Sequence, residues 1–141
     1  LQEEEVPVGA VLVYQEKLIA CAGNESQKRR NPLAHAELLV LEHAIPLLSF
    51  HEWRNATLYV TLEPCPMCMG AVLRVPLGRL VFGAYNLKWG SCGTVLNIMH
   101  ALNQTHCEII GGICEGESQW LLSSFFQNLR NGATSGQSAL I

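Results

Sequence analysis

Two short segments, His35-Ala36-Glu37 and Pro64-Cys65-Pro66-Met67-Cys68, constrain this chain of 141 residues more than any other feature. One histidine and two cysteines supply three ligands for a zinc ion, and Glu37 stands beside them as a carboxylate that is not a ligand. Three protein ligands leave the fourth position of a tetrahedral zinc open for water, as in catalytic rather than structural sites. We therefore predict one zinc per chain, held by His35, Cys65 and Cys68.

Each half of this pattern also has a common alternative explanation. A C-x-x-C segment by itself occurs as a redox pair or as half of a structural zinc site. A single histidine in an apolar helix is usually a packed core residue. The two halves together, both at predicted helix starts, favour a catalytic site over a structural zinc. Zinc acidifies a bound water, and Glu37 would move protons between that water and a leaving group. The combined H-x-E and P-C-x-x-C pattern is the signature of zinc deaminases.

The composition is that of a single domain without a membrane span. Hydrophobic residues make up 49% of the chain, and no apolar run is long enough to cross a bilayer. The first residues do not form a basic, apolar signal segment. Six cysteines without an export signal indicate a reducing compartment, with packed thiols at Cys21, Cys92, Cys107 and Cys114. We expect one domain over residues 1–130, and a disordered tail over the Gly/Ser-rich residues 131–141.

Strand and helix patterns alternate along the chain. Asn31-Pro32 predicts the N-cap and first position of a helix that runs to Ile45, with His35 and Glu37 in its first turn. This alternation predicts a three-layer α/β/α sandwich around a five-stranded mixed sheet, with the ligands where strands give way to helices. The predicted strands are 6–14, 18–22, 56–62, 79–85 and 107–113, and the predicted helices are 32–45, 66–73 and 120–129.

At this level of detail the sequence resembles the bacterial-type tRNA-specific adenosine deaminases, which have the cytidine deaminase-like fold. The resemblance covers roughly residues 5–130 and is most specific around the second ligand segment. It departs from the family pattern at Asn31 and Asn86, where aspartate is common, and at Leu33, where threonine is common. The matching segments are Val6–Val13, Gly23-Asn24, Asn31–Glu37, Leu58–Ala71, Val81–Ala84, Lys88, Gly93 and Leu121–Phe126.

The resemblance implies an activity and a set of residue roles. The family hydrolyses the wobble adenosine of an arginine tRNA to inosine, and works as a homodimer on the anticodon stem-loop. Glu37 would take a proton from the zinc water and deliver protons to the ring and the leaving ammonia. Asn24 would hydrogen-bond the flipped base, although an asparagine here also suits a turn after a strand. Ala36 would contribute its backbone N–H near the reacting centre.

The net charge of −3 means that RNA affinity must come from a local basic patch. The three consecutive basic residues Lys28-Arg29-Arg30 are the clearest candidate, although exposed charges in a loop are usually only solvated. The full set of candidate RNA contacts is Lys28, Arg29, Arg30, Arg74, Asn86, Lys88, Phe125, Phe126 and Arg130.

Two other function classes stay open at this stage: a deaminase of a free base or nucleoside such as guanine or cytidine, and a silent zinc subunit. The apolar segment Gly70–Leu73 is expected at a dimer interface, or else in the core of its own chain. Residues 1–5 resemble only the last turn of the family's first helix, so the N-terminus looks truncated. We expect a cytoplasmic enzyme, with an organelle as the alternative because of that truncation.

Overall fold

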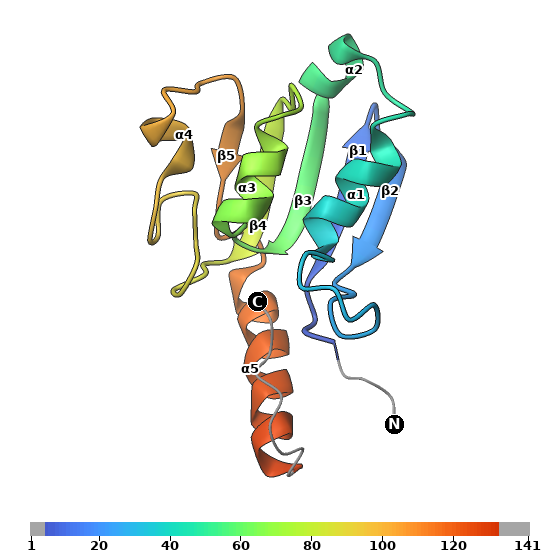
Figure 1. Cartoon of the computed structure of the whole chain (residues 1–141). Helices are drawn as coiled ribbons and strands as arrows, with labels where there is room; N and C mark the ends of the chain where they lie inside the picture. Colours follow the sequence, from blue (N-terminus) through green and yellow to red (C-terminus); the bar gives the residue numbers. More distant parts are fainter. Residues whose placement is uncertain (1–4, 133–141) are drawn as a thin grey trace.

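The computed structural model describes residues 5–132, which form one mixed sheet with helices packed against it (Figure 1). The predicted disordered tail and the first four residues lie almost entirely outside this range. The strands are β1 Gly9–Tyr14, β2 Lys17–Gly23, β3 Ala56–Leu62, β4 Arg79–Ala84 and β5 Glu108–Ile110. The helices are α1 Ala36–Ala44, α2 Phe50–Arg54, α3 Pro66–Val72, α4 Ile98–Ala101 and α5 Glu115–Asn131.

The sheet has the strand order β2-β1-β3-β4-β5. β1 runs antiparallel to both β2 and β3, whereas β3, β4 and β5 are parallel to one another. It follows that β2, β3 and β4 all run in the same direction and end at the same edge of the sheet. The prediction of a five-stranded mixed sheet is thereby confirmed.

The core lies between the sheet and the two helices α1 and α3, which cover the same face (Figure 1). Alternate residues of the central strands, such as Leu12 and Leu58, are fully buried on this face. Val40 of α1 and Val72 of α3 are buried against them. Each such side chain contributes about 1.5–3 kcal/mol by leaving water, so this layer holds the starts of α1 and α3 against the sheet.

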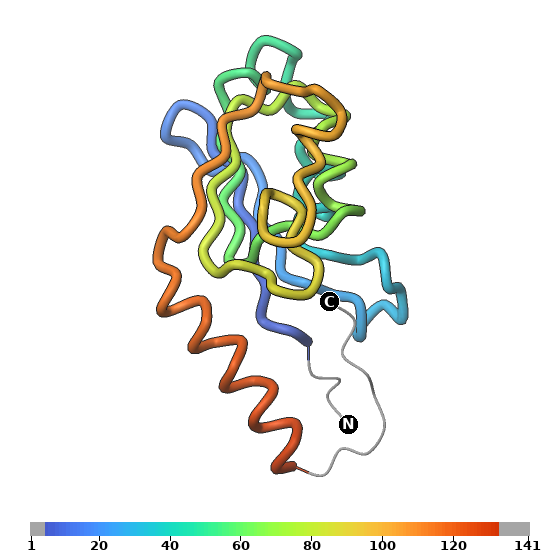
Figure 2. The backbone as a smooth tube through the Cα atoms, turned by 90° about the vertical axis from the view of Figure 1, so that its left-hand side faces the viewer, coloured from blue at the N-terminus to red at the C-terminus, as the bar shows by residue number. Residues whose placement is uncertain are grey.

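The opposite face of the sheet carries the second helical layer, which consists of the first turns of α5. Ser118 is the buried residue of α5, and it packs directly on Gly83 of β4, where a Cβ would lie 2.3 Å from the serine hydroxyl. Beyond these turns α5 continues past the edge at which β3 and β4 end (Figures 1 and 2). Tyr59 on the same face of β3 stays 41% exposed. The far layer of the sandwich therefore covers β3 and β4 only in part.

Several local predictions from the sequence are wrong. The helix expected from Pro32 begins at Ala36 instead, because the side chain of Asn31 accepts the N–H of Leu33 in a turn rather than capping the helix. The short helices α2 and α4 were not predicted, since four or five residues are too few to show a helical period. Asn131 belongs to α5 rather than to a tail, and β5 is shorter than predicted.

Two of the four cysteines that were expected to be packed thiols, Cys21 and Cys114, are exposed instead. All six are free thiols without a disulfide, and Cys107 is buried while Cys92 is half-buried. Cys21 and Cys114 are exposed, because one lies on the open face of edge strand β2 and the other stands just before α5. Burial raises the pKa of Cys92 to about 12 and that of Cys107 to about 11, so both thiols are protonated at neutral pH. No helix in residues 5–132 is long and apolar enough to span a membrane.

Candidate active site

The chain brings its candidate residues together at one edge of the sheet. Asn24 follows the last residue of β2, Cys65 comes three residues after the end of β3, and Asn86 follows β4 by two residues. Helices α1 and α3 begin at this same edge, with His35 and Cys65 as their N-caps. Because the three strands are parallel to one another, side chains far apart in the sequence meet where the strands end.

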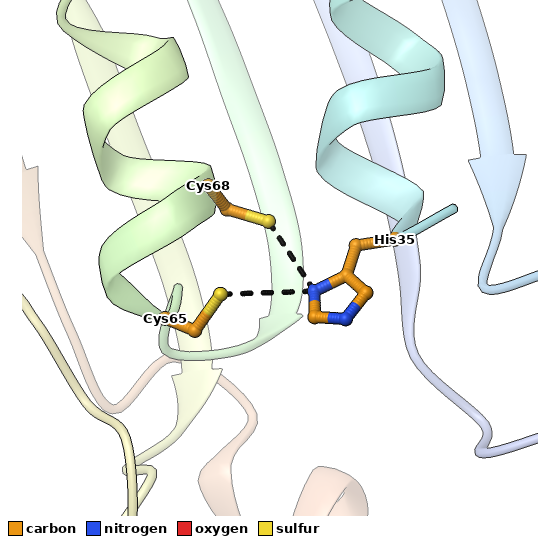
Figure 3. A group of neighbouring side chains, drawn as sticks. All are labelled: His35, Cys65 and Cys68. Carbon is orange, nitrogen blue, oxygen red and sulfur yellow. Dashed lines mark hydrogen bonds between the residues drawn. The ribbon is translucent and has the colours of Figure 1, made fainter. Parts of the chain in front are cut away.

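His35, Cys65 and Cys68 face one another across the gap between α1 and α3 (Figure 3). The Nδ1 atom of His35 lies 3.7 Å from the Sγ of Cys65 and 3.4 Å from the Sγ of Cys68. All three donor atoms lie within 4.8 Å of one another. The first cysteine caps α3 and the second lies in its first turn, so the helix geometry itself brings the two sulfur atoms together.

These distances fit a tetrahedral zinc ion. Zinc bonds of about 2.1 Å to nitrogen and about 2.3 Å to sulfur place two tetrahedral ligands about 3.6 Å apart. The two sulfur-to-nitrogen distances of 3.4 and 3.7 Å bracket that value. A His-Cys-Cys donor set is one that zinc prefers, and it would leave one position for a water molecule.

The two thiols are prepared for metal binding in different ways. The hydrogen bond from Cys68, together with that from His35, lowers the pKa of Cys65 to about 4 and makes it a thiolate at neutral pH. The same hydrogen bond to Cys65, together with burial, raises the pKa of Cys68 well above its usual range. The hydrogen bond to Cys65 also raises the pKa of His35. Metal binding would therefore release protons from this cluster, because ligating thiols are deprotonated and ligating histidine is neutral.

Glu37 lies in the first turn of α1 and is only 4% exposed. Burial raises the pKa of its carboxyl group to about 7, because the charged form loses its hydration. A carboxyl group with a pKa near neutrality exchanges protons readily in both directions at physiological pH. Glu37 is not one of the three clustered donor residues, and a buried carboxyl group with this pKa is suited to carry protons.

A pocket opens beside these residues and joins several predicted positions. Asn24 is buried there, and its side-chain amide donates to the hydroxyl of Ser26 and to the carboxylate of Glu5. Ala36 is the first residue of α1 and is fully buried, so its N–H belongs to the helix start that lacks an intrahelical partner. The pocket is lined by Val6, Val8, Asn24, His35, Glu37, Leu62, Glu63, Cys65 and Asn86.

The basic cluster at residues 28–30 lies in the loop that follows Asn24, with all three residues exposed. The backbone N–H of Lys28 donates to Glu5, which also holds Asn24, so this loop is tied to the pocket. Arg29 forms an ion pair with Glu25, four residues earlier, which lowers its availability to RNA phosphates.

The remaining candidate RNA residues separate into two groups. Lys88 is exposed two residues after Asn86, and Phe125, Phe126 and Arg130 lie on the part of α5 that extends past the site edge (Figure 2). The two phenylalanine rings are half-buried and pack edge to face, with centroids 5.3 Å apart. Arg74, in contrast, follows the C-terminal end of α3, away from the end that carries the cysteines.

Sequence reasoning did not single out Glu63 or the apolar wall of Val6, Val8 and Leu62. Glu63 is 1% exposed, and its carboxylate accepts hydrogen bonds from the loop after β4. An acidic residue directly after a strand without other charges, and directly before the Pro64-Cys65 pair, is the signal that was available in the sequence. A buried carboxylate needs several donors, and here they come from residues 23 to 31 positions later.

Comparisons with known proteins agree with this geometry. The family model of MafB19-like deaminases matches residues 1–130. The tRNA-specific adenosine deaminase of Bacillus subtilis strain 168 is 43% identical over 130 residues, covering 92% of this chain and 81% of that protein. The enzyme of the same name from Haemophilus influenzae is 41% identical over 128 residues, covering 89% of this chain and 74% of that protein.

Solved structures agree at the level of the fold. A structure from a study of A-to-I editing by tRNA:A34 deaminases superposes with a TM-score of 0.73 and 34% identity, covering 82% of this chain and 84% of that one. A guanine deaminase from Nitrosomonas europaea gives a TM-score of 0.68 at 23% identity, covering 84% and 71% of the two chains, and so shares the fold alone. The fold and site thus define a deaminase. Within that class, the chain belongs to the family of tRNA-specific adenosine deaminases.

Proposed function

We propose that this protein hydrolyses the wobble adenosine of a tRNA anticodon loop to inosine, in an arginine tRNA as in the family it resembles. The observation that carries the proposal is the pocket in which Glu37 lies buried beside the His35-Cys65-Cys68 cluster, with Asn24 on its wall. The two relatives described above carry the name of this activity. A free-base deaminase is disfavoured, because the guanine deaminase shares only the fold.

The residue roles are those that the family resemblance implies, and the shared pocket of Asn24, His35, Glu37 and Cys65 supports them. Zinc held by His35, Cys65 and Cys68 would lower the pKa of a bound water, so that hydroxide is available as the nucleophile near neutral pH. Glu37 accepts a proton from that water and delivers protons to the ring nitrogen next to C6 and to the leaving ammonia. Asn24 would hydrogen-bond the flipped base, and Ala36 would contribute its backbone N–H near the reacting centre.

The RNA would enter at the edge of the sheet where the pocket opens. Lys28 and Lys88 stand in two loops that border this edge, and α5 carries Arg130 beyond it. A base must leave its stack to reach the pocket, which costs least in a single-stranded loop. The proposed substrate is therefore an anticodon stem-loop, handled in the cytoplasm where tRNA is matured.

Substrate selectivity is the first test of the proposal. The protein is expected to convert adenosine to inosine in an anticodon stem-loop, to leave the same sequence in a duplex nearly unreacted, and to ignore free adenosine. Inosine is measured in the three substrates after incubation with zinc-loaded protein. Efficient turnover of free guanine or cytidine, with an unreacted stem-loop, would overturn the RNA assignment and leave the zinc deaminase assignment intact.

The salt dependence of binding tests the basic patch in the same system. Each phosphate contact contributes somewhat less than about one unit to the slope of log affinity against log salt. Lys88→Ala and Arg130→Ala are expected to flatten this slope. Lys17→Ala is the matched control, because Lys17 begins β2 at the edge opposite the pocket. Equal slopes in all four proteins would exclude Lys88 and Arg130 as phosphate contacts.

We further propose a homodimer that uses the outer surface of α3. Val72 of this helix is fully buried in the core of its own chain, which was the alternative to a dimer interface for the segment 70–73. Gly70 lies on the other side of the helix, where a Cβ would meet no atom within 4 Å, so a second chain has room to approach closely. Sedimentation at micromolar concentration is expected to show a dimer, and Gly70→Glu is expected to shift it towards monomer. A wild-type monomer with full activity on RNA contradicts a shared site.

A further inference from the structure

Glu63 is a buried acid that the chemistry of deamination does not use. It is the single residue between the end of β3 and the Pro64-Cys65 pair, and only 1% of its surface is exposed. Its Oε2 atom accepts the N–H of Cys92 at 2.9 Å and the N–H of Thr94 at 3.3 Å. Its Oε1 atom accepts the N–H of Asn86 at 3.4 Å and the hydroxyl of Thr94. Both oxygen atoms of the carboxylate are therefore used as acceptors.

All of these donors belong to residues 86–94, here called the 86–94 loop. The loop approaches the carboxylate so closely that a Cβ on Gly90 would lie 2.6 Å from Oε2 of Glu63 and 2.4 Å from the carbonyl oxygen of Asn86. The N–H of Ser91 also donates to the carbonyl of Pro64, the residue next to the first cysteine ligand. The loop is thus wrapped around the segment that carries the metal ligands.

The 86–94 loop in turn forms one wall of the pocket. Asn86 is 6% exposed and lines the pocket, and its side-chain oxygen accepts the N–H groups of Lys88 and Trp89. This turn presents Leu87, which is 83% exposed, and Trp89, which is 45% exposed, beside the site. The loop thus exposes an apolar residue, a cation and an aromatic ring at Leu87, Lys88 and Trp89, and its base is fixed by hydrogen bonds. Such a surface is suited to contact a nucleotide.

We propose that Glu63 is a positioning residue, which anchors the 86–94 loop to the end of β3 and holds the RNA-facing wall of the pocket in one place. The inference rests on the proposed function, because the ligand that the wall meets is the RNA. A loop without this anchor would have to be ordered when RNA binds, and the entropy lost in ordering would weaken binding. Glu63 thereby acts on substrate binding through the loop and not on the reacting atoms.

The glutamine variant separates this role from simple packing. Glu63→Gln keeps the shape of the side chain, but it replaces one acceptor oxygen by an NH₂ group that cannot accept from a backbone N–H. One side of the anchor is then lost while the core volume is unchanged. Thr94→Val removes only the hydroxyl donor, whereas Thr94→Ser keeps it. Glu42→Gln, an exposed acid on α1, is the control for the loss of one negative charge.

Three quantities are measured for each variant: zinc per chain, KM and kcat on the anticodon stem-loop, and amide hydrogen exchange. Glu63→Gln is expected to keep its zinc and to lose about 10²-fold in kcat/KM, mainly through a higher KM. Its amide hydrogens within residues 86–94 are expected to exchange faster than those of the wild type, while exchange in α1 stays unchanged. Thr94→Val is expected to show a smaller change of the same kind, which Thr94→Ser does not show. Glu42→Gln is expected to match the wild type.

Unchanged KM and unchanged exchange within residues 86–94 in Glu63→Gln would overturn the proposal. A Glu63→Gln protein that loses zinc or unfolds, while Thr94→Val behaves as wild type, would overturn it as well, because Glu63 would then support the metal segment only. If the wild type does not react with the stem-loop, the proposed function fails, whereas the exchange experiment still decides whether Glu63 anchors the loop.

Discussion

Glu37→Ala is expected to lose several orders of magnitude in turnover on the anticodon stem-loop while it keeps its fold and its zinc. General acid–base catalysis by one residue contributes about 10²–10⁴-fold, and Glu37 is assigned more than one proton transfer, so the loss should exceed that range. The pKa of about 7 means that the carboxyl group is poised to accept and to donate protons at neutral pH. Rates are measured under single-turnover conditions, so that product release does not mask the chemical step.

Glu37→Gln is the matched variant, because it fills the same buried volume and lacks only the titratable group. It should lose nearly as much activity as the alanine variant, with one zinc per chain in both. Near-wild-type turnover in either protein would show that another group carries the protons. Loss of zinc from Glu37→Gln would instead make Glu37 a part of the metal site.

Cys65→Ala is expected to lose both zinc and activity, and its thermal unfolding temperature is expected to fall. Cys65 is the thiol whose pKa is lowered to about 4, so it is the sulfur best prepared to bind a metal cation. Metal that binds only the folded chain adds its binding free energy to stability, and that contribution disappears with the ligand. Zinc content and unfolding temperature are measured on the same preparations.

Cys21→Ala serves as the control for removing a thiol, because Cys21 is exposed on β2 and lies outside the donor cluster. It should keep one zinc per chain and full activity. Stoichiometric zinc in Cys65→Ala would contradict the proposed ligand set. A disulfide between Cys65 and Cys68 in the active protein would contradict it equally.

The sequence alone allowed the central part of the fold to be predicted. β3 was predicted with its observed limits, and α3 to within one residue at its end, because β-branched residues, Pro66 and the apolar pattern act locally. The start of α1 was predicted four residues too early. Asn31 has the same side chain whether it caps a helix or closes a turn, and only the contacts of the following residues decide between the two.

The residues alone indicate the chemistry: one histidine, two cysteines and one glutamate have the spacing of a zinc deaminase, on a chain of alternating strands and helices. Which distant groups meet depends on how the strands and helices pack. The parallel direction of β2, β3 and β4 brings Asn24, Glu63 and Asn86 to one edge of the sheet. Burial there raises the pKa of Glu37. The buried carboxylate of Glu63 accepts hydrogen bonds from a loop that lies 23 to 31 residues further along the chain. Burial and long-range hydrogen bonds depend on the packed arrangement of elements, and local sequence patterns do not contain that information.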